Sequence, residues 1–123
     1  MPSTLLFQDR CIHFGAAVLR LSYRLPKTPS IRTIADQLTR SGLSVGANAH
    51  EAKSAESRAD FIHKMHIALK EARETSYWLG VLEESGVAED KEFQTLRKEC
   101  NELTAIMVAS IKTAKQNAES LKS

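Results

Sequence analysis

The residues with the clearest potential for chemistry are carboxylates and histidines spaced three apart between positions 60 and 74. Asp60, His63 and His66 form one series, and Glu71 and Glu74 form a pair. Residues three apart lie on one face of a helix, where a carboxylate and a histidine can share a metal ion or exchange a proton. A di-metal bundle needs two carboxylate–histidine pairs and two more carboxylates, whereas the chain offers only Asp60-x-x-His63. We therefore predict solvated histidines, no metal site and no cofactor. An enzyme or metalloprotein that uses His63 with Asp60 or the glutamates is the third and least favoured alternative.

No other segment matches a catalytic motif. The chain has no nucleophile motif, no phosphate-binding glycine loop and no dinucleotide fingerprint. His50-Glu51 resembles the start of the zinc-protease motif H-E-x-x-H, but Ser54 stands in place of the second histidine. Cys11 and Cys100 lie far apart on apolar stripes. We expect them to be reduced core residues of a cytoplasmic protein, without a disulfide.

The elements that position these side chains are expected to be helices. The chain has 123 residues, with only five glycines and three prolines, which favours a single all-α domain over residues 1–123. Three segments carry turn or cap residues, namely 25-LPKTPS-30, 54-SAES-57 and 85-SGVAEDK-91. They separate predicted helices at about 4–24, 30–53, 57–84 and 89–120. Short connections predict an up-down-up-down, antiparallel four-helix bundle.

Each predicted helix carries one apolar stripe with spacings of three and four, which is typical of a core-facing surface. The stripes are Phe7, Cys11, Phe14, Val18 and Leu21; Ile31, Ile34, Leu38, Val45, Ala49 and Ala52; Phe61, Met65, Ala68, Leu69, Ala72 and Leu79; and Phe93, Leu96, Cys100, Leu103, Met107 and Ile111. Gly42 and Gly46 share a face with Val45 and Ala49, so we predict a close helix approach there. Asn48 and Glu51 flank this face, where they bond a neighbour or water, or line a pocket.

Two of the predicted helices are apolar on a second side, whereas helix 89–120 has a polar back. Leu5, Ile12, Ala16, Leu19 and Tyr23 form the extra stripe on the first helix; Ile67, Trp78 and Val81 lie with Glu71 and Glu74 on the outer side of the third. A helix that is apolar on two sides needs a second partner, most simply another copy of the chain. The alternative is that these are isolated exposed residues, which are common on surfaces. The predicted oligomer-interface or pore residues are Ile12, Leu19, Tyr23, Asn48, Glu51, Ile67, Glu71, Glu74 and Trp78.

The charge distribution supports a different function. The net charge is +2, but residues 1–50 hold six basic and two acidic residues, and residues 51–100 hold eight and eleven. Carboxylates of the third helix could therefore pair with Arg20, Arg24 or Arg40, or remain solvated. Arg20, Arg24, Lys27 and Arg32 cluster with Tyr23 around the first turn, as phosphate contact and base stacking would require. The pI of about 8.6 is mild for a nucleic-acid-binding domain.

The run 40-RSGLSVGANAHEAKSAESRADFIHKMHIALKEARETSYWL-79 closely resembles the bacterial four-helix-bundle family, also described as 23S rRNA intervening-sequence proteins. The family pattern reads approximately RSGTSIGANxxEAxxAxSxxDFIHKxxIALKEAxETxYWL. The resemblance implies a bundle assembled into a ring, typically a homopentamer, without an established enzymatic activity. It places Asn48, Glu51, Ser57, Asp60, Lys70, Glu71, Glu74, Tyr77 and Trp78 at motif positions. A related, strongly basic branch is described as a nucleic-acid-binding accessory of reverse transcriptases.

The expectation that follows is a cytoplasmic, non-enzymatic, ring-forming bundle that acts as an adaptor or scaffold. Its expected partner is itself, as a homo-oligomer, and a nucleic acid or a nucleic-acid enzyme is a further candidate. The alternative function is an RNA- or DNA-binding accessory oligomer that uses the basic cluster. No run of about 18 apolar residues and no signal-peptide pattern is found, so we expect no membrane partner.

Overall fold

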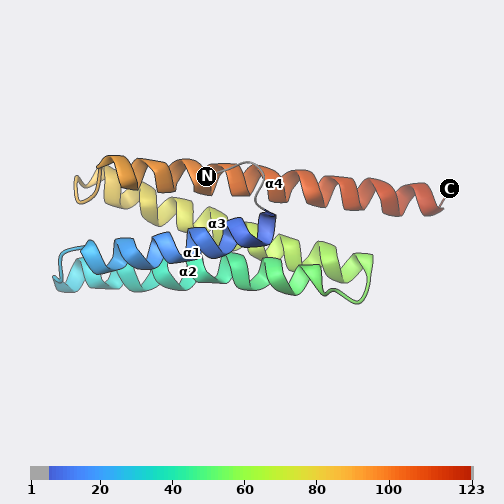
Figure 1. Cartoon of the computed structure of the whole chain (residues 1–123), viewed down its shortest axis with the longest axis horizontal. Helices are drawn as coiled ribbons and strands as arrows, with labels where there is room; N and C mark the ends of the chain where they lie inside the picture. The colour runs from blue at the N-terminus through green and yellow to red at the C-terminus, as the bar shows by residue number, and fades with distance from the viewer. Residues whose placement is uncertain (1–5, 123) are drawn as a thin grey trace.

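Four helices fold back and forth in chain order (Figure 1). The computed structural model describes the backbone of residues 6–122 and the side chains of residues 6–117. The helices are α1 (Phe7–Arg24), α2 (Pro29–Lys53), α3 (Arg58–Glu84) and α4 (Lys91–Lys122). All four predicted helices are present, and their ends differ from the predicted ones by at most three residues.

The helix ends follow from the turn residues that the sequence places between the apolar stripes. Thr28 caps α2 by accepting a hydrogen bond from the Ile31 N–H at 3.4 Å, and a proline occupies the first position of the helix. Ser57 caps α3 by accepting from the Asp60 N–H at 3.0 Å. Gly86 follows the end of α3 with φ +78°, a conformation that costs other residues energy.

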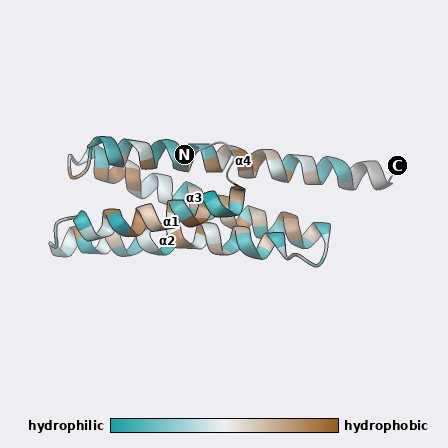
Figure 2. Cartoon of the chain, viewed as in Figure 1, coloured by the Kyte–Doolittle hydropathy of each residue, from teal (hydrophilic) through white to brown (hydrophobic). Residues whose placement is uncertain are grey.

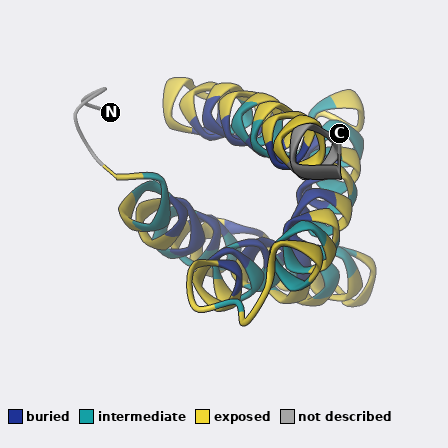
Figure 3. Ribbon diagram, turned by 90° about the vertical axis from the view of Figure 1, so that its right-hand side faces the viewer, coloured by how far each residue is buried: buried dark blue, intermediate teal, exposed yellow. Residues whose placement is uncertain are grey.

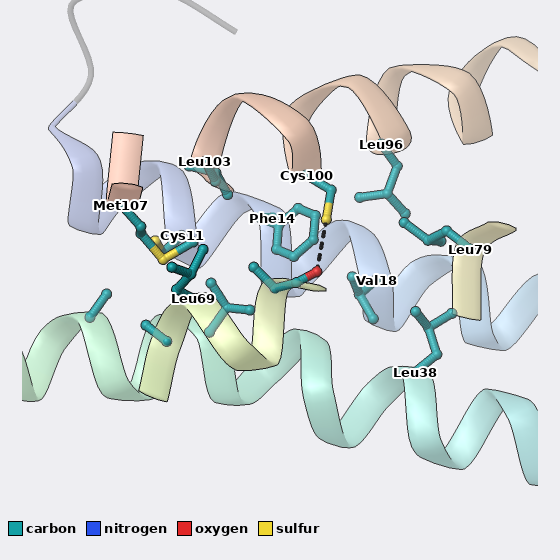
Figure 4. Close-up of a cluster of buried hydrophobic side chains, with 14 of the residues drawn as sticks. Cys11, Phe14, Val18, Leu38, Leu69, Leu79, Leu96, Cys100, Leu103 and Met107 are labelled. Carbon is teal, nitrogen blue, oxygen red and sulfur yellow. Dashed lines mark hydrogen bonds between the residues drawn. The ribbon is translucent and has the colours of Figure 1, made fainter. Parts of the chain in front are cut away.

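The predicted stripes form the core. Nearly all of their members are buried, including every predicted core residue of α4, and the exceptions are half-buried residues near helix ends. The helices surround a common interior in chain order, and their buried residues face inward (Figure 3). Apolar and polar residues alternate around each helix, as an amphipathic bundle requires (Figure 2). Cys100 Sγ donates to the Ala72 carbonyl oxygen at 3.4 Å and joins α4 to α3 inside this core (Figure 4).

The predicted close helix approach lies between α1 and α2. Gly42 is buried, and a Cβ atom added there would lie 2.9 Å from both methyl groups of Val18. A Cβ atom added at Gly46 would lie 3.3 Å from the Cβ of Cys11. The two glycines therefore face α1, and their cost to helix stability is offset by contacts that a side chain would prevent.

Among the adjacent helix pairs of the bundle, α1 and α4 have the least extensive contact. The other adjacent pairs, which short loops connect, pack more extensively than α1 and α4 do. Ion pairs reinforce this seam: Arg10 donates through Nε to Glu99 at 3.0 Å and also reaches Glu102 at 3.5 Å. Hydrogen bonds to Glu99 raise the pKa of Arg10, so the guanidinium remains charged at this joint.

Helix α4 is longer than its partners, and its C-terminal part runs past the beginning of α1 (Figure 1). In this part of α4, Val108 is 43% exposed and Ile106 is only partly covered, and the two residues lie on opposite sides of the buried stripe. Among the described residues, no helix is long and apolar enough to cross a membrane.

Candidate functional site

Four polar residues of the family-like run 40–79 form one network at the seam between α2 and α3. Arg40 Nη1 donates to Glu71 Oε2 at 2.9 Å, and Arg40 Nη2 donates to Glu74. Trp78 Nε1 donates to the same Glu74 carboxylate at 3.1 Å. The hydrogen bonds from Trp78 and Arg40 hold the pKa of Glu74 below its usual value. Of the arginines proposed as partners for these glutamates, Arg40 is the one that meets them, within the same chain.

A buried pair of hydroxyls lies directly beneath this network. Thr75 Oγ1 lies 2.8 Å from both Ser41 Oγ and the carbonyl oxygen of Glu71. Ser41 and Thr75 are both fully buried, and their hydrogen bonds leave neither side chain unsatisfied. The Ser41–Thr75 hydrogen bond links α2 to α3 inside the core, and each hydroxyl also bonds a carbonyl oxygen of its own helix. The arrangement is a structural clamp, in which Arg40 forms ion pairs with both carboxylates.

Asn48 and Glu51, which were predicted to flank the face of Gly42 and Gly46, bond other groups near the C-terminal end of α2. Asn48 Nδ2 donates to the Ser44 carbonyl oxygen on its own helix at 2.8 Å, and the residue is half-buried. Glu51 is exposed and forms an ion pair with Lys64 of α3 at 3.2 Å. The two residues therefore do not join Glu71 and Glu74 in one site.

The apolar residues predicted to face outward divide into two groups. Ile12 and Tyr23 of α1 are 57% and 70% exposed, so the second stripe of α1 does reach the surface. Leu19 and Ile67 are half-buried, and Leu5 lies outside the described residues. Trp78 is half-buried as well and packs against the core. Its indole N–H is used by Glu74, so Trp78 is a poorer candidate for an interface than its position in the sequence indicated.

Tyr77 and Leu43 are among the exposed apolar residues that the prediction did not name as interface residues. Tyr77 is 63% exposed, and its ring meets the edge of Trp78 with ring centroids 5.1 Å apart. Leu43 of α2 is 44% exposed and lies against Gly15 of α1, where an added Cβ would be 3.2 Å from a Leu43 methyl group. The family pattern contained Tyr77 as a motif position, which was the available signal. Leu43 had none, because it lies on no second stripe of its helix.

These residues define two separate apolar faces. The α1–α2 face surrounds a shallow hollow of about 250 Å³, which is lined by Cys11, Ile12, Gly15, Ala16, Leu43, Gly46, Ala47 and His50. The α3 face surrounds a hollow of about 450 Å³, which is lined by Tyr77, Gly80, Val81, Glu84 and Ser85. No helix of the described chain covers the exposed apolar side chains on either face.

The basic cluster around the α1–α2 turn is partly engaged inside the chain. Lys27 Nζ donates to the carbonyl oxygens of Ser22 and Tyr23, at 3.1 and 3.2 Å, and so caps the end of α1. Arg24 forms an ion pair with Glu92 at 3.1 Å. Arg20 and Arg32 are exposed and form no ion pair with any described side chain. Two of the four predicted contacts to a nucleic acid therefore have other roles.

The histidine series does not form a site. His63 and His66 are exposed, and Asp60 accepts a hydrogen bond from the Glu56 N–H at 3.3 Å. Among the side chains that the structure describes, no cluster of three or more His, Cys, Asp or Glu residues is placed to hold a metal ion. Cys11 and Cys100 are both free and buried, and burial raises the pKa of each thiol to about 12.

Comparison with known proteins agrees with this architecture. Residues 4–109 match the family model of the 23S rRNA-intervening sequence proteins. The chain is also similar to a protein of unknown function from the S23 ribosomal protein family of Bacteroides thetaiotaomicron, whose crystal structure superposes with a TM-score of 0.81. The two sequences are 34% identical over 87% of this chain and 99% of the other. None of the curated proteins compared with the chain matches it.

Proposed function

Since the chain belongs to the 23S rRNA-intervening sequence protein family, we propose that it is a non-enzymatic helical bundle that assembles into a homo-oligomeric ring. In this role it acts in the cytoplasm as an adaptor or scaffold, and a pentamer is the favoured ring. The single observation that carries the proposal is that two exposed apolar faces lie on different helices. These are the α1–α2 face, with Ile12 and Leu43, and the α3 face, with Tyr77 and Val81.

The geometry of two different faces favours a ring over a two-fold dimer. In a two-fold dimer, each subunit uses the same patch, so both faces are buried only if they form one continuous patch. When one face of a subunit packs on the other face of the next, both become buried. Such head-to-tail contacts close into a ring or continue as a filament. Exposed apolar faces of this kind on a small soluble domain are typical of interaction surfaces.

The assembly is tested by measuring the molar mass in solution with light scattering on a sizing column. We expect the unmodified protein to have about five times the 13.7 kDa mass of one chain. Ile12→Asp and Tyr77→Asp each place a charge on one face, and we expect either variant to be monomeric because a buried unpaired carboxylate costs several kcal/mol. Val108→Asp on the exposed side of α4 is the matched control and should retain the wild-type mass.

A monomeric wild-type protein at micromolar concentration would contradict the assembly. A ring that survives both substitutions would show that the two faces are not the interface. Circular dichroism on each variant separates loss of assembly from loss of folding. Tyr77 is preferred over Trp78 for this test, because Trp78 contacts the core and Glu74 within its own chain.

Binding of a single-stranded nucleic acid is the second candidate function. It is supported by Arg20 and Arg32, whose guanidinium groups are exposed, and by Tyr23, whose ring is 70% exposed near them. Tyr23 and Arg32 line one hollow of about 230 Å³ between α1 and α2. A ring would repeat this cluster in every subunit and raise its effective charge.

The nucleic-acid function predicts binding that weakens steeply with salt. We expect Arg20→Ala with Arg32→Ala to weaken the binding of a labelled RNA oligonucleotide and to lower the salt slope by about 1 for each lost phosphate contact. Arg73→Ala is the control, because Arg73 is an exposed arginine of α3 outside the cluster. Equal losses for the cluster and the control variant would contradict a site at the α1–α2 turn.

A further inference from the structure

The side of α4 that faces α1 continues beyond the beginning of α1. Arg10 of α1 contacts Glu99 and Glu102, which identifies the α1-facing side of α4. The same side continues at helical spacing through Ile106, Ala109, Ser110, Thr113 and Asn117. The first described turn of α1 begins at Phe7, only three residues before Arg10, whereas α4 extends to Lys122. Figure 1 shows the resulting overhang of α4.

This continuation forms one wall of a groove on the surface of the described chain. The groove has a volume of about 700 Å³ and lies between the first turns of α3 and the second half of α4. It is lined by Arg58, Phe61, Ile106, Ala109, Ser110, Thr113, Ala114 and Asn117. Phe61 and Ile106 are half-buried apolar walls, and the α4 side otherwise consists mainly of small residues that allow another backbone to come close.

The charge of the groove is one-sided. Arg58 is exposed at the start of α3, and it forms no ion pair with a described side chain. No carboxylate is among the described side chains that line the groove. An apolar groove with a single cationic end fits an amphipathic helix that carries a carboxylate beside its apolar stripe.

We propose that this groove binds one helix of a partner protein. Near the loop between α3 and α4, this side of α4 packs against α1. Beyond the beginning of α1, the same side packs against the partner helix. The wall from Ile106 to Asn117 is about 16 Å long at 1.5 Å per residue, which corresponds to about three turns of the bound helix. The apolar residues of the partner helix lie at i, i+3, i+4 and i+7 and pack against Phe61 and Ile106. An acidic residue of the partner helix faces Arg58. This partner is the client of the proposed adaptor, and the proposal rests on that role but not on the ring.

The test uses a fluorescent helical peptide of about 14 residues, stabilised by a side-chain cross-link because isolated helices of this length are marginal. It carries leucine and alanine at the apolar positions and glutamate on the flanks; a twin peptide carries lysine in place of glutamate. We expect the glutamate peptide to bind with a micromolar Kd and the lysine twin to bind about tenfold more weakly. Arg58→Glu should reverse this preference without unfolding α3, since an acidic residue is favourable at a helix start.

Ala109→Trp should block the groove and weaken binding at least about tenfold, whereas Val108→Trp, on a different side of the same turn, should not change it. No binding of the glutamate peptide, or equal binding by the two Trp variants, overturns the proposal. Tighter binding by a chain lacking residues 1–5 identifies that segment as the natural occupant and also overturns it. A molar mass that falls in Ala109→Trp assigns the groove to a second copy. If the molar mass still indicates a ring but the peptide does not bind, the proposed assembly stands and only the partner-helix proposal is overturned.

Discussion

Replacement of Gly42 by alanine tests the close approach of α1 and α2. In the interior of a helix, glycine to alanine normally stabilises a protein by about 1 kcal/mol. Gly42 is different because the new methyl group would lie 2.9 Å from both methyl groups of Val18. Val18 is fully buried, and β-branched side chains in helices have one strongly preferred rotamer, so it has no low-energy way to move aside.

The expected effect follows from two opposing contributions. Overpacking a well-packed core costs about 1–3 kcal/mol, and the gain in helix propensity recovers about 1 kcal/mol. We therefore expect Gly42→Ala to lower the free energy of unfolding by about 1 kcal/mol, which corresponds to a fall in Tm of about 4 °C for a chain of this length. The unfolding free energy is measured by urea denaturation followed by circular dichroism at 222 nm.

Gly80→Ala in α3 is the matched control. A Cβ atom added there meets only Arg97 Nη2 at 3.8 Å, which is ordinary contact, so we expect this variant to be more stable than wild type by about 1 kcal/mol. Val18→Ala should make room for the methyl group at position 42, so the double variant should lose less stability than the sum of the two single losses. If Gly42→Ala stabilises the protein as much as Gly80→Ala does, the packing argument for the α1–α2 contact is wrong.

Two further predictions concern ionisable groups. Burial raises the thiol pKa of Cys11 and Cys100 to about 12, so neither should react with a thiol reagent at pH 8 in the folded protein, although both should react in urea; rapid labelling without denaturant would contradict their burial. Glu74 has a lowered pKa in the folded state because Trp78 and Arg40 bond its carboxylate, so its contribution to stability is complete above the unfolded pKa of about 4.3 and is lost as the pH falls toward the folded pKa. Glu74→Gln should therefore flatten the pH dependence of the unfolding free energy below about pH 4.3, and an unchanged acid profile would show that the Arg40 network does not stabilise the fold.

The helices and their core sides could be predicted because each one rests on a local signal. Apolar spacing identifies the buried side of a helix, and Thr28, Ser57 and Gly86 mark where helices begin and end. Both kinds of signal are read within about one or two turns of sequence, so they do not depend on how the helices are arranged. The close approach of another helix to Gly42 and Gly46 could also be predicted, because two glycines on one face of a helix indicate tight helix packing there.

The exposed residues were harder to predict because exposure depends on neighbouring helices. Trp78 and Tyr77 are adjacent in sequence, yet Trp78 packs against the core and Tyr77 extends into solvent. The indole N–H of Trp78 bonds Glu74 on the same helix, and Tyr77 has no such contact among the described residues. The partial exposure of Ile106 depends on a neighbouring helix, since the α1-facing side of α4 continues past the beginning of α1.

The family-like run 40–79 contributes both to the contacts between α2 and α3 and to the proposed assembly faces, but through different residues. Arg40, Glu71, Glu74 and Trp78 bond one another across the α2–α3 seam above the buried Ser41–Thr75 pair. Residues that hold α2 against α3 do not identify the binding partner of the bundle, because this packing is required whatever the bundle binds. Within this run, Leu43 and Tyr77 are the large apolar side chains most exposed to solvent. If the bundle is a scaffold, the clamp therefore makes the scaffold rigid, and these exposed residues, together with those of α1, determine what it assembles with.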